Sequence, residues 1–203
     1  TVAGQIAESV KNDCVVVIKS TVPIGTNDKV ETYIREHLKE PVQVDCASNP
    51  EFLSQGTAVR DTLSASRIII GAEDENTKQK LLRVYQDFSA PKLVTDRRSA
   101  EMIKYASNDF LALKISYINE IANFCEIVGA DIEDVAQGMG LDSRIGNRFL
   151  QAGIGYGGSC FPKDTKALHW LGNYYDNEFK TIKAAIEVNE NQKLKLIKKS
   201  RQY

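Results

Sequence analysis

The chain has 203 residues, of which 42% are hydrophobic, and its formal net charge is −1. This length suffices for one large domain or two small ones, and the near-neutral charge gives no reason to expect a nucleic-acid or membrane partner. No apolar run approaches the ~20 residues of a membrane span. The four cysteines are far apart, so the sequence predicts no disulfide framework and no metal site, and favours the reducing cytoplasm.

The first half alternates between helical and strand patterns. Residues 2–10 have the apolar spacing of a helix but no strand before them, which suggests that the chain begins within a fold. Short apolar or alternating runs predict strands at 14–18, 42–46, 67–71 and 92–94, with helices over about 28–39 and 76–88. This order is typical of a parallel sheet with crossover helices. We interpret residues 1–97 as part of a doubly wound, Rossmann-like domain.

The second half has only helical patterns. Residues 99–128 contain neither glycine nor proline, and apolar residues recur there at helical spacing. A helix of this length runs roughly 45 Å, which is typical of a helix that joins two domains or lines a subunit interface. Shorter helices are expected at 131–137, 162–171 and about 178–199. Residues 98–203 are therefore expected to be all helical.

The most informative stretch is Gly-Ile-Gly-Tyr-Gly-Gly-Ser-Cys-Phe-Pro-Lys-Asp at 153–164. Its glycines satisfy the G-x-G-x-x-G fingerprint, but that motif should follow a buried strand, and residues 147–152 have no strand pattern. Pro162 suits the first turn of a helix, which places Cys160 just ahead of an N-terminus whose dipole favours a thiolate. Lys163 adds positive charge, and Asp164 could transfer protons. We predict that this is a mobile glycine loop that leads to a nucleophilic cysteine.

Two weaker patterns bring polar groups together. Lys104 and Asn108 are four residues apart on the long helix, so they share a face and could stabilise an oxyanion, although this spacing is also common on solvated surfaces. Polar loops at 20–23 and 48–53 follow two predicted strands, at the end where open α/β sheets bind ligands. A binding crevice and ordinary turns explain these loops equally well.

Four motifs occur in order along the chain, and they carry a resemblance. They are Lys-Ser-Thr-Val-Pro (19–23), Asn-Pro-Glu-Phe-Leu (49–53), Ala-Glu-Met-Ile-Lys-Tyr-Ala-Ser-Asn (100–108) and Gly-Gly-Ser-Cys-Phe-Pro-Lys-Asp (157–164). Together they resemble the UDP-glucose/GDP-mannose dehydrogenase family over nearly the whole chain, and its UDP-glucose members most closely. The resemblance implies oxidation of UDP-glucose to UDP-glucuronate by two NAD⁺, through a thiohemiacetal and a thioester on Cys160.

The resemblance also implies roles for single residues. Lys104 and Asn108 would stabilise oxyanions, and Asp164 would transfer protons. Thr21 and Glu51 would position water, with Glu51 the base for thioester hydrolysis. Cofactor contacts are expected from Thr21, Gln55 and Lys163, and substrate contacts from Phe52, Leu53, Lys104, Asn108, Arg144, Phe149, Gln151, Tyr156 and Gly157. Gln55 replaces a glutamate of many relatives and cannot act as a base, and Gln151 stands where a basic residue often contacts substrate.

The resemblance further implies a homodimer packed on the long helix, in which Arg144 reaches the partner subunit's substrate. Residues 1–97 would be the C-terminal part of the NAD-binding domain. Residues 98–203 would be the central catalytic and dimerisation domain, running into the linker to a missing C-terminal domain. Because the family's glycine-rich phosphate loop is expected to be missing too, we predict that the isolated chain is inactive. The alternatives are a dehydrogenase of small hydroxy acids, of GDP-mannose or of UDP-N-acetylmannosamine, and a non-catalytic dimerisation module.

Overall fold

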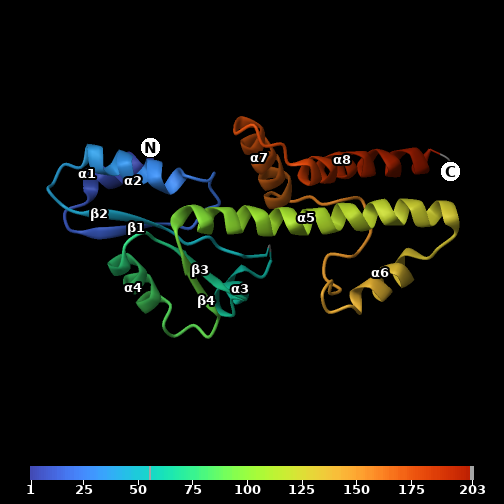
Figure 1. Ribbon diagram of the computed structural model, residues 1–203, viewed down its shortest axis with the longest axis horizontal. Coiled ribbons are helices and arrows are strands. Elements are labelled where there is room, and N and C mark those ends of the chain that lie inside the picture. Colours follow the sequence, from blue (N-terminus) through green and yellow to red (C-terminus); the bar gives the residue numbers. More distant parts are fainter. Residues whose placement is uncertain (55, 202–203) are drawn as a thin grey trace. The chain divides into compact units, whose positions relative to one another are not determined.

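A computed structural model describes residues 1–54 and 56–201 (Figure 1). The chain divides into two compact units, Thr1–Lys104 and Tyr105–Tyr203. The predicted fold class, a partial Rossmann-like sheet followed by a long helix and an all-helical region, is confirmed. Over the described ranges, no helix combines the length and the apolar character that crossing a membrane requires.

The sheet of the first unit contains β1 (Cys14–Ile18), β2 (Val44–Ser48), β3 (Ile68–Gly71) and β4 (Lys92–Thr95), in that spatial order. The pairs β1–β2 and β3–β4 are parallel, but β2 and β3 are antiparallel and meet only at Ser48 and Gly71. The expectation of an entirely parallel sheet was therefore wrong at one position. The helix between these strands, α3 (Ala58–Leu63), has only six residues, or about 9 Å. It is too short to return the chain along the roughly 16 Å of β2.

Helices cover both faces of this sheet (Figure 1). Helices α1 (Val2–Ser9) and α2 (Thr26–His37) enclose one core with alternate residues of β1 and β2. Helix α4 (Glu75–Val84) encloses the other core, against the opposite residues of these strands and against β3. Because side chains alternate between the faces of a strand, the apolar run of β1 supplies both cores.

The second unit contains helices and loops but no strand among its described residues. Helix α5 (Arg97–Val128) begins in the first unit and continues into the second, where α6 (Ile132–Gly140), α7 (Cys160–Tyr174) and α8 (Lys180–Ser200) follow it. The hydroxyl of Ser116 on α5 donates to the carbonyl of Ala185 on α8, at 2.7 Å. This buried hydrogen bond joins α5 to α8.

Candidate active site

Two polar loops leave the sheet at the same edge. Strands β1 and β2 pair in parallel with Ile18 opposite Ser48, and the backbone N–H of Asn49 donates to the carbonyl of Ile18 at 2.9 Å. The loop that follows β1 carries Thr21, and the loop that follows β2 carries Glu51. Both predicted residues thus follow neighbouring strands at their carboxyl ends, where open α/β sheets bind ligands.

The loop after β2 contacts Lys104, which lies on the part of α5 that belongs to the first unit. Lys104 is only 4% exposed, and its Nζ lies 3.7 Å from Glu51 Oε1. The other carboxylate oxygen of Glu51 accepts the backbone N–H of Leu53 at 2.8 Å. The ammonium of Lys104 also lies 5.0 Å from the ring centre of Phe52, within cation–π range. The structure therefore brings together four predicted residues, Glu51, Phe52, Leu53 and Lys104.

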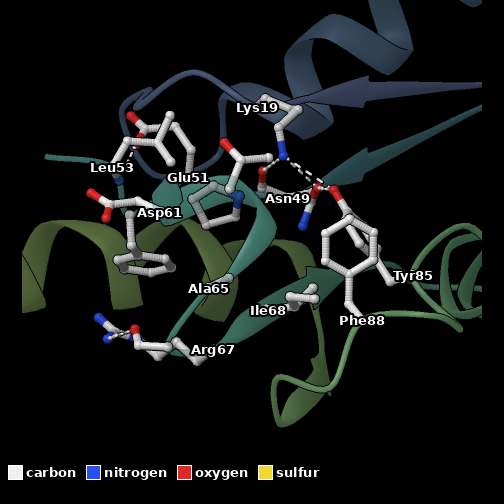
Figure 2. Close-up of a pocket in the computed structure, with 14 residues that line it drawn as sticks. Lys19, Asn49, Glu51, Leu53, Asp61, Ala65, Arg67, Ile68, Tyr85 and Phe88 are labelled. Atoms are coloured by element: carbon white, nitrogen blue, oxygen red, sulfur yellow. Dashed lines mark hydrogen bonds between the residues drawn. The ribbon is translucent and has the colours of Figure 1, made fainter. Parts of the chain in front are cut away.

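The same loop borders a pocket of about 90 Å³ (Figure 2). On one side, the side chains of Lys19, Asn49 and Tyr85 converge, and Lys19 Nζ donates to Asn49 Oδ1 at 2.8 Å. On the other side, the guanidinium of Arg67 lies 3.9 Å from the ring centre of Phe52. No role was predicted for Lys19, Tyr85 or Arg67, because only the fold brings them to this loop. Gln55, a predicted cofactor contact, lies outside the described residues.

In the second unit, Cys160 is the first residue of α7. Its side chain is exposed, and its Sγ lies 3.8 Å from Ser159 Oγ. Ser159 is the N-cap residue but makes no side-chain cap hydrogen bond. The first N–H groups of a helix lack intrahelical acceptors, and together with the helix dipole they favour an anion at this position. Cys160 therefore places an exposed sulfur at the start of α7, beside backbone N–H groups that lack intrahelical acceptors.

A buried carboxylate lies one turn further along α7. Asp164 is 0% exposed, and its Oδ2 accepts from Asn108 Nδ2 at 2.6 Å. Its Oδ1 accepts from Lys163 Nζ at 2.5 Å. Three predicted residues, Asn108, Lys163 and Asp164, thus form one cluster. The amide of Asn108 has a fixed direction because Asp164 holds its N–H group.

A second carboxyl lies beside this cluster, and sequence analysis missed it. Asp109 on α5 is 4% exposed, and within residues 1–54 and 56–201 neither of its carboxylate oxygens has a hydrogen-bond partner. Burial, together with the negative charge of Asp164, raises the pKa of Asp109 to about 7. The burial of Asp109 could not be predicted from the sequence, because an aspartate on a helix is most often exposed.

The glycine loop before α7 is held by amide side chains. Asn119 Oδ1 accepts the N–H of Gly153 at 2.7 Å, and Gln192 Nε2 donates to its carbonyl at 2.8 Å. Asn189 accepts the N–H of Tyr156 at 2.6 Å and donates to the carbonyl of Tyr156. Gly155 has a φ of 101°, and a Cβ there would lie 2.4 Å from Asn189 Oδ1. The loop that the sequence suggested to be mobile is thus bound to α5 and α8 at several points.

The remaining predicted substrate residues lie in or near this loop. Phe149, with a φ of 65°, and Tyr156 each place their rings 6.2 Å from the ring of Phe161, in edge-to-face geometry. Gln151 and Gly157 are exposed. The side chain of Arg144 is 88% exposed and forms an ion pair with Asp142, at 2.6 Å. The predicted site residues therefore fall into two groups, one in each compact unit.

Comparison with known proteins decides the family. Residues 1–89 match the NAD binding domain of the UDP-glucose/GDP-mannose dehydrogenase family, and residues 98–191 match its central domain. The chain belongs to this family.

The relatives include several dehydrogenases of nucleotide sugars. UDP-glucose 6-dehydrogenase YwqF of Bacillus subtilis is 58% identical over 98% of this chain. The solved structure of a UDP-glucose dehydrogenase from Pyrobaculum islandicum has a TM-score of 0.86 and 46% identity over 89% of this chain. That of a UDP-D-ManNAc dehydrogenase from Pyrococcus horikoshii has a TM-score of 0.82 and 26% identity over 94%. The chain spans 45%, 42% and 45% of these three proteins, respectively.

Membership of this family raises the question of which part of NAD the described residues fit. The polar loops after β1 and β2 suit the reactive end of a dinucleotide, whereas a pyrophosphate needs the free N–H groups of a helix N-terminus. In the first unit, the three longer helices that follow strands have these groups bonded to carboxylates. The carboxylates belong to Glu101 at α2, Asp74 at α4, and Asp96 and Glu73 at α5. None of these N-termini is left free for a pyrophosphate.

Proposed function

We propose that this chain is the part of an NAD-dependent dehydrogenase that oxidises C6 of UDP-glucose to the carboxylate of UDP-glucuronate. In this proposal residues 1–97 belong to the NAD-binding domain, and residues 98–203 form the central domain. The observation that carries the proposal is an exposed Cys160 at the first position of α7, one turn before the buried Asp164 that Asn108 and Lys163 hold. The substrate follows from the names of the relatives, among them the UDP-glucose 6-dehydrogenase YwqF.

In the proposed reaction, bound NAD⁺ would serve as the hydride acceptor for two successive oxidations of the substrate carbon. After the first oxidation, the Cys160 thiolate attacks the C6 aldehyde, and a carbon–sulfur bond forms in a thiohemiacetal. The second oxidation converts this adduct to a thioester. Water then adds to the thioester, the carbon–sulfur bond breaks, and the carboxylate leaves while the thiolate is restored.

The remaining residues serve this covalent route. Asn108 is held by Asp164 and Lys104 is buried, so both suit the stabilisation of an oxygen that becomes negatively charged. Glu51 lies 3.7 Å from Lys104, beyond direct hydrogen-bond distance, which leaves it able to bind and deprotonate the hydrolytic water with help from Thr21. Asp164 transfers protons one turn from Cys160. Thr21, Gln55 and Lys163 contact the cofactor.

Substrate binding is assigned to both groups of residues. Phe52 and Leu53 would contact the nucleotide sugar from the first unit, and Phe149, Gln151, Tyr156 and Gly157 from the glycine-loop region of the second. The exposed Arg144 would reach the substrate of a partner subunit. A homodimer would form on α5, where Phe110, Tyr117 and Phe124 recur every seven residues, with 62%, 48% and 60% of their surfaces exposed. Light scattering of a variant with all three replaced by serine should report a monomer.

The isolated chain of 203 residues is proposed to be inactive, because carboxylates already bond to N-terminal N–H groups of α2, α4 and α5, the three longer helices that follow strands in its first unit. Turnover of UDP-glucose by this chain alone would contradict that statement.

The test of the function uses the full-length protein of which this chain is a part. Two NADH formed per UDP-glucose consumed would support the thioester route, and one would mean that oxidation stops at a carbonyl. Alkylation should block activity through Cys160, because this cysteine is exposed, whereas Cys14 is half-buried and Cys46 and Cys125 are buried. The variant Cys160→Ala should lose at least ~10³-fold in turnover. The same assay with UDP-N-acetylmannosamine tests the second candidate, which the fold similarity to a UDP-D-ManNAc dehydrogenase favours.

A further inference from the structure

The strongest unexplained feature of the second unit is a buried carboxyl group without partners. Both carboxylate oxygens of Asp109 are buried, and no described residue donates a hydrogen bond to either. A buried ionised carboxylate without donors is strongly disfavoured, so the group is expected to keep its proton. The same helix presents Asn108 immediately before it, and Asn108 donates to Asp164.

The charged and titratable groups around Asp109 come from three elements. Helix α7 supplies Asp164, which interacts electrostatically with Asp109, and Lys163, which donates to Asp164. The glycine loop supplies the buried Tyr156, whose pKa is raised chiefly by burial and also by the charges of Asp109 and Glu190 of α8. The only cation in this set is Lys163, and it bonds to Asp164. No cation in this set is therefore left to balance the negative charge of Asp109 when Asp109 ionises.

We propose that the buried Asp109 and Asp164 act as a carboxyl pair that carries one proton in total, with Asp109 as the positioning residue. In the resting pair, Asp109 is the neutral acid and Asp164 the anion that orients Asn108. When Asp164 gains a proton, Asp109 can lose its own, so the pair keeps one negative charge while a proton moves. This inference rests on the proposed function only where it gives Asp164 a proton to transfer.

The first experiment measures the pair directly in the 203-residue chain. Aspartate labelled with ¹³C at the carboxyl carbon is followed by NMR from pH 4 to pH 9. One carboxyl should titrate with a midpoint of about 7, and that titration should disappear in Asp109→Asn. It should persist in the control Asp134→Asn, which makes the same chemical change at an exposed position of α6.

A second variant tests whether the two carboxyls are coupled, and it does not depend on Asp109→Asn folding. Lys163 is half exposed, so Lys163→Met should fold, and loss of the cation beside Asp164 should raise the midpoint by about one pH unit. A midpoint that stays at its wild-type value, or an Asp109 that titrates in the ordinary aspartate range, would overturn the pair.

The functional part is read from the pH dependence of kcat in the full-length protein. The wild type should show an ionisation near pH 7 that Asp109→Asn lacks and Asp134→Asn retains. Identical profiles for wild type and Asp109→Asn would overturn the catalytic part. If no nucleotide sugar is turned over by the wild type but the carboxyl titration and its response to Lys163→Met are found, the proposed function fails and the pair stands.

Discussion

Helix α5 buries two carboxyl groups about two turns apart, and the two have opposite surroundings. Glu101, in the first unit, is 3% exposed and accepts hydrogen bonds from the N–H of Gly25, the N–H of Asn27 and the side-chain amide of Asn27. Asp109, in the second unit, is 4% exposed and accepts none from the described residues.

The difference separates a structural carboxylate from a candidate functional one. Glu101 supplies the cap of α2 that Gly25, with its φ of 87° and no side chain, cannot supply. Asp109 receives no hydrogen bond from the described residues, and its ionised form costs folding free energy because it is buried and Asp164 is negatively charged. Groups that are costly to fold and have no structural partner are concentrated at functional sites.

The largest effect is expected for Glu101→Ala. This change leaves three donors at the start of α2 without an acceptor, two of them on the buried Asn27. We expect the free energy of unfolding of the first unit to fall by about 3–5 kcal/mol. Urea unfolding followed by circular dichroism measures it, with Glu120→Ala, an exposed change on the same helix, as the control. A loss below about 1 kcal/mol would mean that the cap is not structural.

The next effect depends on pH. Folding raises the pKa of Asp109 from 3.8 to about 7, so the folded state binds an extra proton between these values. Stability from this group is therefore present below pH 4 and is lost as the pH rises through about 7, by up to roughly 4 kcal/mol. The difference in unfolding free energy between wild type and Asp109→Asn isolates it, because groups such as Asp96 titrate in both. A difference that is constant from pH 4 to pH 8 would contradict the shift.

A smaller effect is expected in the glycine loop. Asn189→Ala removes both hydrogen bonds to the buried backbone of Tyr156 and should cost about 2 kcal/mol. Gln192→Ala removes a bond to the exposed carbonyl of Gly153 and a part-buried bond from Asn123, and should cost about 1 kcal/mol. Hydrogen exchange of the Tyr156 amide distinguishes the two variants, since only Asn189→Ala should accelerate it strongly. Equal effects would show that burial does not decide the strength of these contacts.

The smallest effect is expected for Arg144→Ala. The guanidinium is exposed and pairs only with the neighbouring Asp142 among the described residues, so the urea midpoint of the isolated chain should not change. If Arg144 reaches the substrate of a partner subunit, the full-length variant should instead lose kcat/KM. A shifted midpoint in the isolated chain would mean that this ion pair is structural.

Much of the fold could be predicted from the sequence, because β1 is a continuous apolar run and α2, α4 and α5 have helical patterns. Strand β2 was placed at 42–46 but occupies Val44–Ser48, all of it buried. The polar residues within 42–46 produced the alternating pattern that predicted a strand there. One of them, Asp45, is nevertheless buried, and it pairs with Arg35. The short helix α3 was missed, and with it the antiparallel pairing of β2 and β3, since six residues give too little periodicity to detect.

The candidate site likewise contains residues that could be predicted from the sequence and residues that could not. Cys160, Asn108 and Asp164 lie in recognisable motifs, but the hydrogen bonds that Asn108 and Lys163 donate to Asp164 were not predicted from them. Asp109 and Asn189 could not be predicted, because their roles depend on which residues of distant helices face them. Sequence spacing specifies neighbours within one helix, whereas burial and hydrogen-bond partners across helices are set by tertiary packing.

The cap on α2 also orders events during synthesis of the chain. Gly25 donates to a carboxylate 76 positions later in the sequence. At roughly 5–20 residues per second, the ribosome needs about 4–15 s to add the intervening residues. For that interval, the first N–H groups of α2 have only water as their acceptor. The N-terminus of α2 therefore gains its carboxylate acceptor only after the start of α5 has left the ribosome. The first unit accordingly completes its folding late in synthesis.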